Sequence, residues 1–384
     1  MLPFSRQAAI VGVHEHTTRW APDKTAYQIA AESARAALAD AGLTLRDVDG
    51  YFTAGVEGIA PALMCDHLNI RPRVVDSTAI GGTSFLAHTA HAVSAIVTGR
   101  CEVALITYGS TAASQSVAVG TRGRYGVEIP EQYETPYGVT TVGAYAMCAQ
   151  RHMYEFGTTS EQLAEIAVTF RQHASLNPYA KYREPISVED VLTSRLISAP
   201  LHLLDCCIIS DGGGAVVVTS AARARDCAKA PVWILGAGET VFHPEAGKRN
   251  FLRMAASQTA PIAMGQAGVT HADIDMCMIY DSFSITVLMT LENLGFCQLG
   301  EGGAFVSGGR LALGGALPTN TDGGGMSSNH PGMRGIFLII EATRQLRREC
   351  GARQVPDCTL ALAHGTGGAL GTRHGGVTLI LGRD

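Results

Sequence analysis

Three polar side chains lie where this sequence would place acid–base chemistry. Tyr280 follows the apolar run "DMCMI", His364 ends the apolar run "LALAH" at a glycine turn, and His330 lies in the glycine-rich segment "GGGMSSNHPGMRG". Open α/β sheets bind ligands at the ends of their strands. Histidine titrates near neutral pH, whereas a phenol, with a reference pKa of about 10, serves best as a hydrogen-bond donor. These residues are our catalytic candidates; the alternatives are a strand-capping tyrosine at 280 and a backbone-bonded loop histidine at 330.

Residues near these candidates are expected to bind substrate. The segment "DSTAIGGTSF" contains Gly82 and Ser84 at a strand-to-helix turn, where backbone N–H groups can bind an oxyanion. Gly365 and Gly367 offer similar groups at the final glycine turn. No base accompanies Ser84 in the sequence, so a helix cap is the simpler interpretation of its hydroxyl. Asp281 is a further candidate, although we expect it to cap the helix predicted over "SFSITVLMTLENLG".

Other chemical motifs are weak. The histidines of "HEH" and "HTAH" have no accompanying cysteines or acidic cluster, so they indicate no metal site. The segment "ILGAGETV" begins like a dinucleotide-binding fingerprint but lacks its last glycine, and no Walker motif is present. We therefore expect no metal and no bound cofactor.

Composition limits the class of protein. The 384 residues exceed the roughly 250–300 at which one hydrophobic core stops growing, so two domains or two similar halves are expected. Apolar residues make up 46% and charged residues 16%, which favours large buried sheets. A net charge of −5 without basic runs argues against nucleic acid as a partner. No segment has the ~20 apolar residues of a membrane span. Without a recognisable signal peptide, and with ten cysteines but no CxxC pair, we expect a cytoplasmic protein.

The chain also repeats its own pattern. Three segments of the first half match three of the second half in the same order: 37–50 with 263–275, 101–110 with 358–367, and 212–220 with 374–382. In the first pair, "ALADAGLTLRDVDG" aligns with "AMGQAGVTHADID", and each copy has a helical pattern that ends at a glycine. Three matches in register predict an internal duplication.

Helical segments alternate with these strands, which predicts an α/β fold of duplicated βαβ halves. Helices are expected at 26–42, 84–99, 141–156 and 335–350, and the capping box "TSEQ" begins another at 159–162. The more polar segment 111–205 reads as an inserted cap. Its cations would meet an anionic ligand or form a solvated face: Arg122, Arg124, Lys181 and Arg183. The predicted domains are 1–110 for the first half, 111–205 for the cap, 206–228 for the last strand of the first half, and 229–384 for the second half.

Long motifs in this chain resemble the thiolase superfamily, specifically the sterol-carrier-protein-type thiolases. The resemblance is carried by "NPYAKYR" (177–183), "PLHLLDCCIISDGGGAVVVTS" (200–220), "YDSFSITVLMTLENLGFCQLGEGGAFV" (280–306) and the "NHPGM" loop (329–333). It implies a five-layer α/β/α/β/α body in which the cap is a loop domain that covers an acyl-CoA thioester. It also implies coenzyme A thioesters as substrates, without a bound cofactor, and a homodimer.

The chain departs from this family at both of its catalytic cysteines. The position of the family's nucleophilic cysteine falls on Gly82, and that of its second, acid–base cysteine falls on His364. Glycine cannot form an acyl-enzyme. The histidine of the family's H-P loop matches His330, and the residue that holds the catalytic water or thioester oxygen matches Tyr280.

These substitutions favour a reaction without a covalent intermediate. Some members of this branch act as aldolases on acyl-CoA side chains together with a small zinc-ribbon/OB-fold partner, so the resemblance implies a retro-aldol lyase. The alternatives are a thiolase or acyltransferase that uses another nucleophile, such as Ser84, and a non-catalytic acyl-CoA or lipid carrier.

Overall fold

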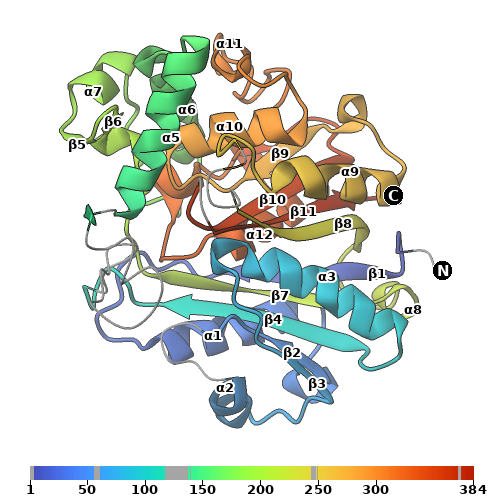
Figure 1. Cartoon of the computed structure of the whole chain (residues 1–384). Helices are drawn as coiled ribbons and strands as arrows, with labels where there is room; N and C mark the ends of the chain where they lie inside the picture. The colour runs from blue at the N-terminus through green and yellow to red at the C-terminus, as the bar shows by residue number, and fades with distance from the viewer. Residues whose placement is uncertain are drawn as a thin grey trace.

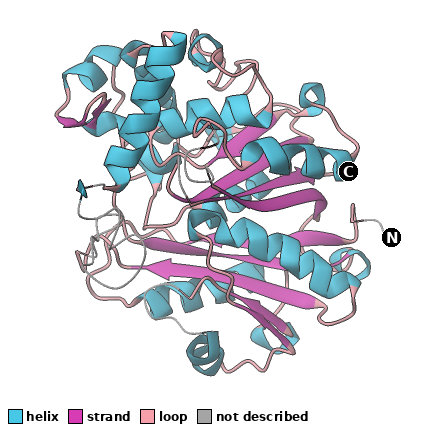
Figure 2. Ribbon diagram, viewed as in Figure 1, coloured by secondary structure: helices cyan, strands magenta, loops and turns pink. Residues whose placement is uncertain are grey.

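Nine strands form one mixed sheet in the described part of the chain, and helices cover it (Figures 1 and 2). The computed structural model describes residues 4–55, 61–116, 137–138, 140–243, 248, 250–370 and 373–384. The strands are β1 (Ala8–Glu15), β2 (Gly50–Phe52), β3 (Val74–Asp76), β4 (Val103–Ser110), β7 (Gly212–Ser220), β8 (Val232–Phe242), β9 (Met276–Ile279), β10 (Leu360–Gly368) and β11 (His374–Gly382). The helices outside the cap are α1 (Ala26–Asp40), α2 (Pro61–Leu68), α3 (Ser84–Val97), α8 (Ala221–Ala224), α9 (Ala256–Ala267), α10 (Ser284–Leu294), α11 (Gly302–Val306) and α12 (Gly335–Leu346).

Strand order confirms the predicted duplication. The sheet runs β3-β2-β4-β7-β1-β8-β11-β10-β9, so the series β2-β4-β7-β1 of the first half has its counterpart in β9-β10-β11-β8 of the second. The first pair of each series is parallel, and the pairs that follow are antiparallel. The halves join where β1 pairs with β8, through Ala9 with Trp233 and Ile10 with Val232.

The same turn structure precedes β2 and β9. In each half a helix ends at a glycine with positive φ, which is +72° at Gly42 and +69° at Gly268. A short 3₁₀ turn follows, η1 (Leu45–Asp47) or η6 (His271–Asp273). Each turn begins with a Thr whose backbone N–H donates to an Asp three residues later. These are the two copies that the sequence comparison matched.

Five layers result, as predicted (Figure 1). Helices α3 and α12 pack against each other and against strands of both halves, so they form the central layer. Helix α1 covers the outer face of the first half and α9 that of the second. Side chains alternate along each strand, so in β4 Ala104 and Ile106 face the central layer while Val103 and Leu105 face α1.

The described part of the segment predicted as a cap contributes no strand to the nine-stranded sheet. Its described part holds α5 (Thr141–Phe156), α6 (Ser160–Ser175), α7 (Val188–Thr193), a small pair of strands β5 (Leu196–Ser198) and β6 (Leu201–His202), and the 3₁₀ turn η5 (Leu203–Asp205). The predicted capping box begins α6, with Thr159 and Gln162 bonded reciprocally. Arg122 and Arg124 lie outside the described residues, and the domain boundaries remain predictions.

The cap is held to the body by a buried polar pair. His152 of α5 contacts both carboxylate oxygens of Glu292 on α10 at 3.0 Å, and both side chains are fully buried. Glu292 also accepts hydrogen bonds from the backbone N–H groups of Gly300 and Gly302. None of the helices described is long and apolar enough to cross a membrane.

Candidate active site

A cavity of about 420 Å³ lies beside the end of β9, between the cap and the glycine turns of the body. Its described lining includes Tyr145 of α5, Phe283 before α10, His330, and the glycines at 82 and 367. No Asp, Glu, Lys or Arg belongs to that described lining. Acid–base chemistry inside the cavity therefore falls to its tyrosines, cysteines and histidine.

Two of the predicted catalytic residues meet in this cavity. The hydroxyl of Tyr280 lies 3.1 Å from Nε2 of His330, and the two rings are perpendicular with centroids 5.7 Å apart. Burial raises the pKa of Tyr280 well above its usual value. Burial, together with the charge of Arg334, lowers the pKa of His330 to about 4. At neutral pH the phenol is therefore protonated and the imidazole is neutral.

Backbone and loop contacts position this pair. Tyr280 follows β9 and donates its N–H to the carbonyl oxygen of His364 on β10. The His330 N–H donates to Ser210 Oγ at 3.0 Å. Tyr108 of β4 donates its hydroxyl to the carbonyl oxygen of Pro331 at 2.5 Å and accepts from the Met333 N–H at 3.1 Å. The loop that carries His330 is thus attached to both halves of the sheet.

Gly82 lies against the ring of Tyr280. A Cβ added at this glycine would lie 2.2 Å from Cε2 and 2.6 Å from the hydroxyl oxygen of Tyr280. Such separations are far shorter than any van der Waals contact between carbon atoms. The phenol therefore occupies the space in which a side chain at position 82 would stand.

Ser84 does not line the cavity. It is the first residue of α3, and its hydroxyl donates to the carbonyl oxygen of Gly81 at 2.6 Å and accepts from the N–H of Ile80 at 2.9 Å. Both bonds close the turn η3 (Gly81–Thr83) that leads into the helix. Ser84 is therefore not the helix cap that the sequence favoured, because Thr83 precedes α3 and no side chain caps this helix. Its hydroxyl is bonded within the preceding turn instead.

The prediction that Asp281 caps the helix after it is wrong. Helix α10 begins at Ser284 after Phe283, and no side chain caps it. Asp281 is instead buried against Arg334, with 2.9 Å between Oδ1 and Nε, and accepts from the N–H groups of Gly325 and Met326. Burial raises the pKa of Asp281 to about 6, and Arg334 opposes this shift.

Arg334 and Asp322 were missed by the sequence reasoning. Arg334 is fully buried and also pairs with both oxygens of Asp322, at 2.7 and 2.8 Å. The two carboxylates and the guanidinium lie under the loop that carries His330. The sequence did contain an indication that Arg334 is buried and paired, since it is the only charged residue between Asp322 and Glu341. An isolated charge in an apolar stretch is buried only when it is paired.

His364 lies on the other side of the sheet from Gly82. Its Nδ1 contacts Thr378 Oγ1 at 2.8 Å, and Thr378 contacts Thr259 of α9. Burial lowers the pKa of His364 to about 3. The structure therefore does not bring this imidazole to the Tyr280–His330 pair.

The neighbouring glycines face the central layer. A Cβ at Gly365 would contact Thr83, and one at Gly367 would lie 1.7 Å from the carbonyl oxygen of Ile80. Gly367 lines the cavity, whereas Gly365 does not. The glycine at 367 therefore permits close backbone packing at the cavity wall.

Two cysteines line the cavity, which the sequence gave no reason to expect. Burial raises the pKa of Cys206 to about 12 and that of Cys207 further. Both are therefore thiols at neutral pH, and the thiolate is the nucleophilic form. Lys181, from the predicted cationic set, donates to the carbonyl oxygen of Ile209 at the cavity rim, while Arg183 donates to Ser175.

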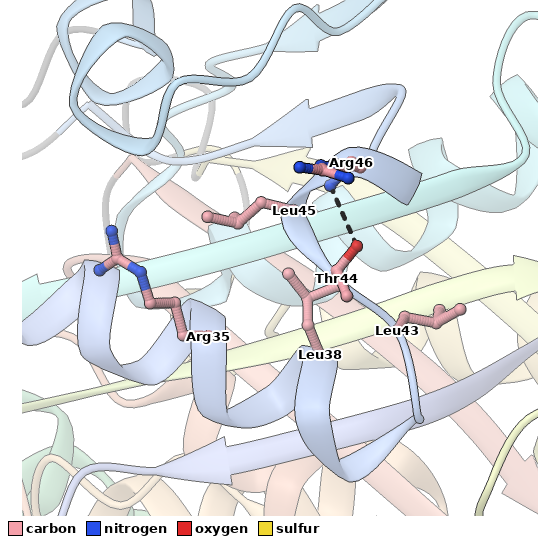
Figure 3. Close-up of a pocket in the computed structure, with 6 residues that line it drawn as sticks. All are labelled: Arg35, Leu38, Leu43, Thr44, Leu45 and Arg46. Carbon is pink, nitrogen blue, oxygen red and sulfur yellow. Dashed lines mark hydrogen bonds between the residues drawn. The ribbon is translucent and has the colours of Figure 1, made fainter.

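A second pocket, of about 440 Å³, lies at the end of α1 (Figure 3). Leu38, Leu43 and Leu45 line it between the side chains of Arg35 and Arg46. Thr44 accepts a hydrogen bond from the N–H of Arg46 there. It offers no acid–base pair, so we assign the chemistry to the first cavity. Among the described residues, no cluster of three or more His, Cys, Asp or Glu could hold a metal ion.

Known proteins with similar sequences and structures define the family. A family model described as "Thiolase C-terminal domain-like" matches residues 238–383. An acetyl-CoA acetyltransferase of Methanothermobacter thermautotrophicus is 32% identical over 96% of this chain and 98% of its own length. A 17-hydroxy-3-oxo-4-pregnene-20-carboxyl-CoA lyase of Mycobacterium tuberculosis is 35% identical over 90% of this chain and 92% of its own.

A solved structure gives the same result. The structure described as "Ltp2-ChsH2(DUF35) aldolase" superposes with a TM-score of 0.90 at 33% identity, and covers 100% of this chain and 99% of its own. The chain belongs to the thiolase superfamily, in the sterol-carrier-protein-type branch that includes the side-chain aldolases, as its motifs predicted.

Proposed function

We propose that this protein cleaves a carbon–carbon bond of a β-hydroxyacyl-CoA thioester by a retro-aldol reaction, without a covalent acyl-enzyme. The names of two relatives, a lyase and an aldolase, support this reaction class. The observation that carries the proposal is the phenol of Tyr280 in the space beside Gly82. A hydrogen-bond donor there replaces the side chain that would otherwise attack the thioester.

Proton transfer within the Tyr280–His330 pair would complete the reaction. With the imidazole proton on Nδ1, Nε2 of His330 is the acceptor that lies 3.1 Å from the phenol oxygen. When the phenol O–H donates to the thioester oxygen, Nε2 accepts the proton of the β-hydroxyl. As the Cα–Cβ bond breaks, its electrons form the thioester enolate and a carbonyl product leaves.

The same proton then returns to the substrate. The imidazolium of His330 is destabilised by burial, as its lowered pKa indicates, so it readily gives its proton to the α-carbon of the enolate. Hydrogen bonds from Tyr280 and from backbone N–H groups of the glycine turns hold the enolate oxygen meanwhile. The net reaction converts one β-hydroxyacyl thioester to one carbonyl compound and one shorter acyl thioester.

The predicted partners belong to the same proposal. We infer an acyl-CoA substrate, a homodimer and a small zinc-ribbon/OB-fold partner that binds acyl-CoA. The partner is supported by the solved relative, whose description joins two components. An acyltransferase remains the second candidate because one relative carries that name, but Ser84, Cys206 and Cys207 are each bonded locally or held as protonated thiols.

Product analysis with and without free coenzyme A tests the proposal. The protein, alone and with a co-encoded partner, is incubated with β-hydroxyacyl-CoA and β-ketoacyl-CoA thioesters. We expect CoA-independent release of a carbonyl product from the β-hydroxyacyl thioester and no acyl adduct in the mass spectrum of the protein. Cleavage that requires free CoA, or an acylated side chain, would establish the acyltransferase instead. Tight binding without turnover would indicate a carrier.

A matched pair of variants tests the role of the phenol. Tyr280→Phe keeps the ring beside Gly82 and removes only the hydroxyl, so we expect a rate loss of about 10²-fold or more. Tyr154→Phe, at an exposed tyrosine of α5, should leave the rate unchanged. An unchanged rate in Tyr280→Phe would exclude the phenol as a donor to the enolate.

A further inference from the structure

Arg334 lies between the two segments that carry the proposed catalytic residues. Its Nη1 donates to the carbonyl oxygen of Asn329 at 3.1 Å, and Asn329 directly precedes His330. Its Nε lies 2.9 Å from Oδ1 of Asp281, which directly follows Tyr280. One side chain therefore contacts the chain neighbours of both catalytic residues, which lie 50 positions apart in the sequence.

These groups converge around the glycine at position 325. A Cβ added at Gly325 would lie 3.0 Å from Cδ of Arg334 and 3.1 Å from Cδ2 of His330. The same Cβ would lie 3.2 Å from Oδ1 of Asp281. Arg334 is not among the described residues that line the cavity, so any effect of its guanidinium on a substrate would pass through these neighbours.

Two buried carboxylates hold the guanidinium in place. Asp322 accepts from Nη2 of Arg334 through both of its oxygens, at 2.7 and 2.8 Å. Asp281 also accepts from two backbone N–H groups of the glycine-rich loop. All three side chains are at most 1% exposed. Because the guanidinium is planar and is held at several points, it has one orientation. It therefore fixes Asp281 and Asn329 relative to each other.

The charge of Arg334 also acts on the imidazole of His330. Burial, together with this charge, lowers the pKa of His330 to about 4. Tyr280 faces the imidazole as a neutral phenol, and Asp281 and Asp322 are paired with Arg334 itself. Loss of the cation would raise the pKa of the imidazole. A protonated Nε2 could not accept the proton of the β-hydroxyl.

We propose that Arg334 is a positioning residue of the active site, which holds the phenol of Tyr280 and the imidazole of His330 at hydrogen-bond distance from each other. It acts through the side chain of Asp281 on one segment and the carbonyl oxygen of Asn329 on the other. This inference rests on the proposed function, because it takes the phenol as the donor and the imidazole as the proton acceptor of the lyase reaction. Arg334 itself takes up no proton and does not touch the substrate.

Two substitutions separate the shape of the guanidinium from its charge. Arg334→Met removes both, so we expect kcat to fall about 10²-fold while KM changes less than about threefold. The pH at which kcat/KM falls to half on the acid side should rise by about one unit or more, because the imidazole loses a neighbouring cation. Arg334→Lys keeps a positive charge but not the planar fork, so kcat should fall about tenfold while this pH stays near that of the wild type.

Arg353→Met is the matched control. Arg353 is also buried, and it pairs with the carboxylate of Glu341 at 2.9 and 3.1 Å. It is not among the described residues that line the cavity. Arg353→Met should therefore lose stability in chemical denaturation, as Arg334→Met does, yet keep the wild-type kcat and pH profile.

The outcomes distinguish this inference from the proposed function. Equal losses of kcat in Arg334→Met and Arg353→Met would trace the effect to destabilisation and overturn the positioning role. Wild-type kcat and pH profile in Arg334→Met would overturn it as well. If that variant does not fold, wild-type kcat in Arg334→Lys is the result that would refute it. Failure of the wild-type protein to cleave any β-hydroxyacyl-CoA thioester would instead refute the proposed function.

Discussion

Adding one methyl group at Gly82 tests whether the phenol of Tyr280 fills the space beside it. In Gly82→Ala the new Cβ would stand 2.2 Å from Cε2 of the ring, whereas carbon atoms in contact are about 3.5 Å apart. The ring must therefore move by about 1 Å or more. Its hydroxyl is 3.1 Å from His330 Nε2, so this displacement would take the pair beyond hydrogen-bond distance.

The expected cost follows from overpacking. Insertion of a methyl group into a packed site lowers the free energy of unfolding by about 1–3 kcal/mol. The φ of Gly82 lies outside the left-handed region, so backbone strain adds nothing to this cost. The rate should fall about 10²-fold, as when an oxyanion donor is displaced. Chemical denaturation and the lyase assay measure the two effects separately.

Two further variants make the result interpretable. Gly265→Ala lies in α9 with nothing within 4 Å of its added Cβ, so it should stabilise by about 0.5–1 kcal/mol. In a Tyr280→Ala background, Gly82→Ala should cost almost nothing, which gives a coupling energy of about 1–3 kcal/mol. If Gly82→Ala keeps wild-type stability and rate, the phenol does not occupy this space and the argument against an acyl-enzyme loses its structural basis.

Three other predictions concern buried charge. Arg334→Met leaves Asp281 and Asp322 buried without their cation and should cost about 3–5 kcal/mol, whereas Arg151→Met, in an exposed pair on α5, should cost at most about 1 kcal/mol; equal losses in chemical denaturation would contradict this. The folded-state pKa values of His88, His330 and His374 are lowered to about 4, and that of His364 to about 3. The unfolded chain therefore binds protons first, so the contribution of these four histidines to stability is complete above pH ~6.5. It falls as the pH drops toward 4, by up to about 1.4 kcal/mol per pH unit for each histidine. Chemical denaturation at pH 7, 6 and 5 should show this slope. In His88→Leu the unfolded chain should take up one proton less relative to the folded chain, and a flat profile would refute the prediction. For the same reason kcat/KM should remain near its maximum at pH 5.5, and a loss of half the activity near pH 6.5 would show that His330 is not the neutral base we propose.

Local sequence was sufficient for much of the fold. The helix predicted at 141–156 is α5 with the same bounds, and the "TSEQ" capping box begins α6. The duplicated glycine and Thr–Asp turns appear at the predicted positions. These features depend on side-chain and backbone bonds within a few residues, so one sequence suffices to predict them.

The sequence predicted only some of the residues that contact each other from distant positions in the chain. Tyr280 and His330 were predicted separately as candidates, and the structure brings them together from positions 50 residues apart. The partner of Asp281 is Arg334 rather than the nearby helix end, because a buried carboxylate is stabilised more by a cation than by a cap that solvent can replace. Nothing local to "YDSF" indicates that choice.

By itself the sequence determined the thiolase-type halves, their strands and turns, and the absence of cysteine at positions 82 and 364. Only the tertiary structure decided which face of β10 His364 occupies and that the ring of Tyr280 stands beside Gly82. Strand side chains alternate, so a shift of one residue in register reverses the face. Register and packing depend on contacts between distant segments, and no local pattern encodes them.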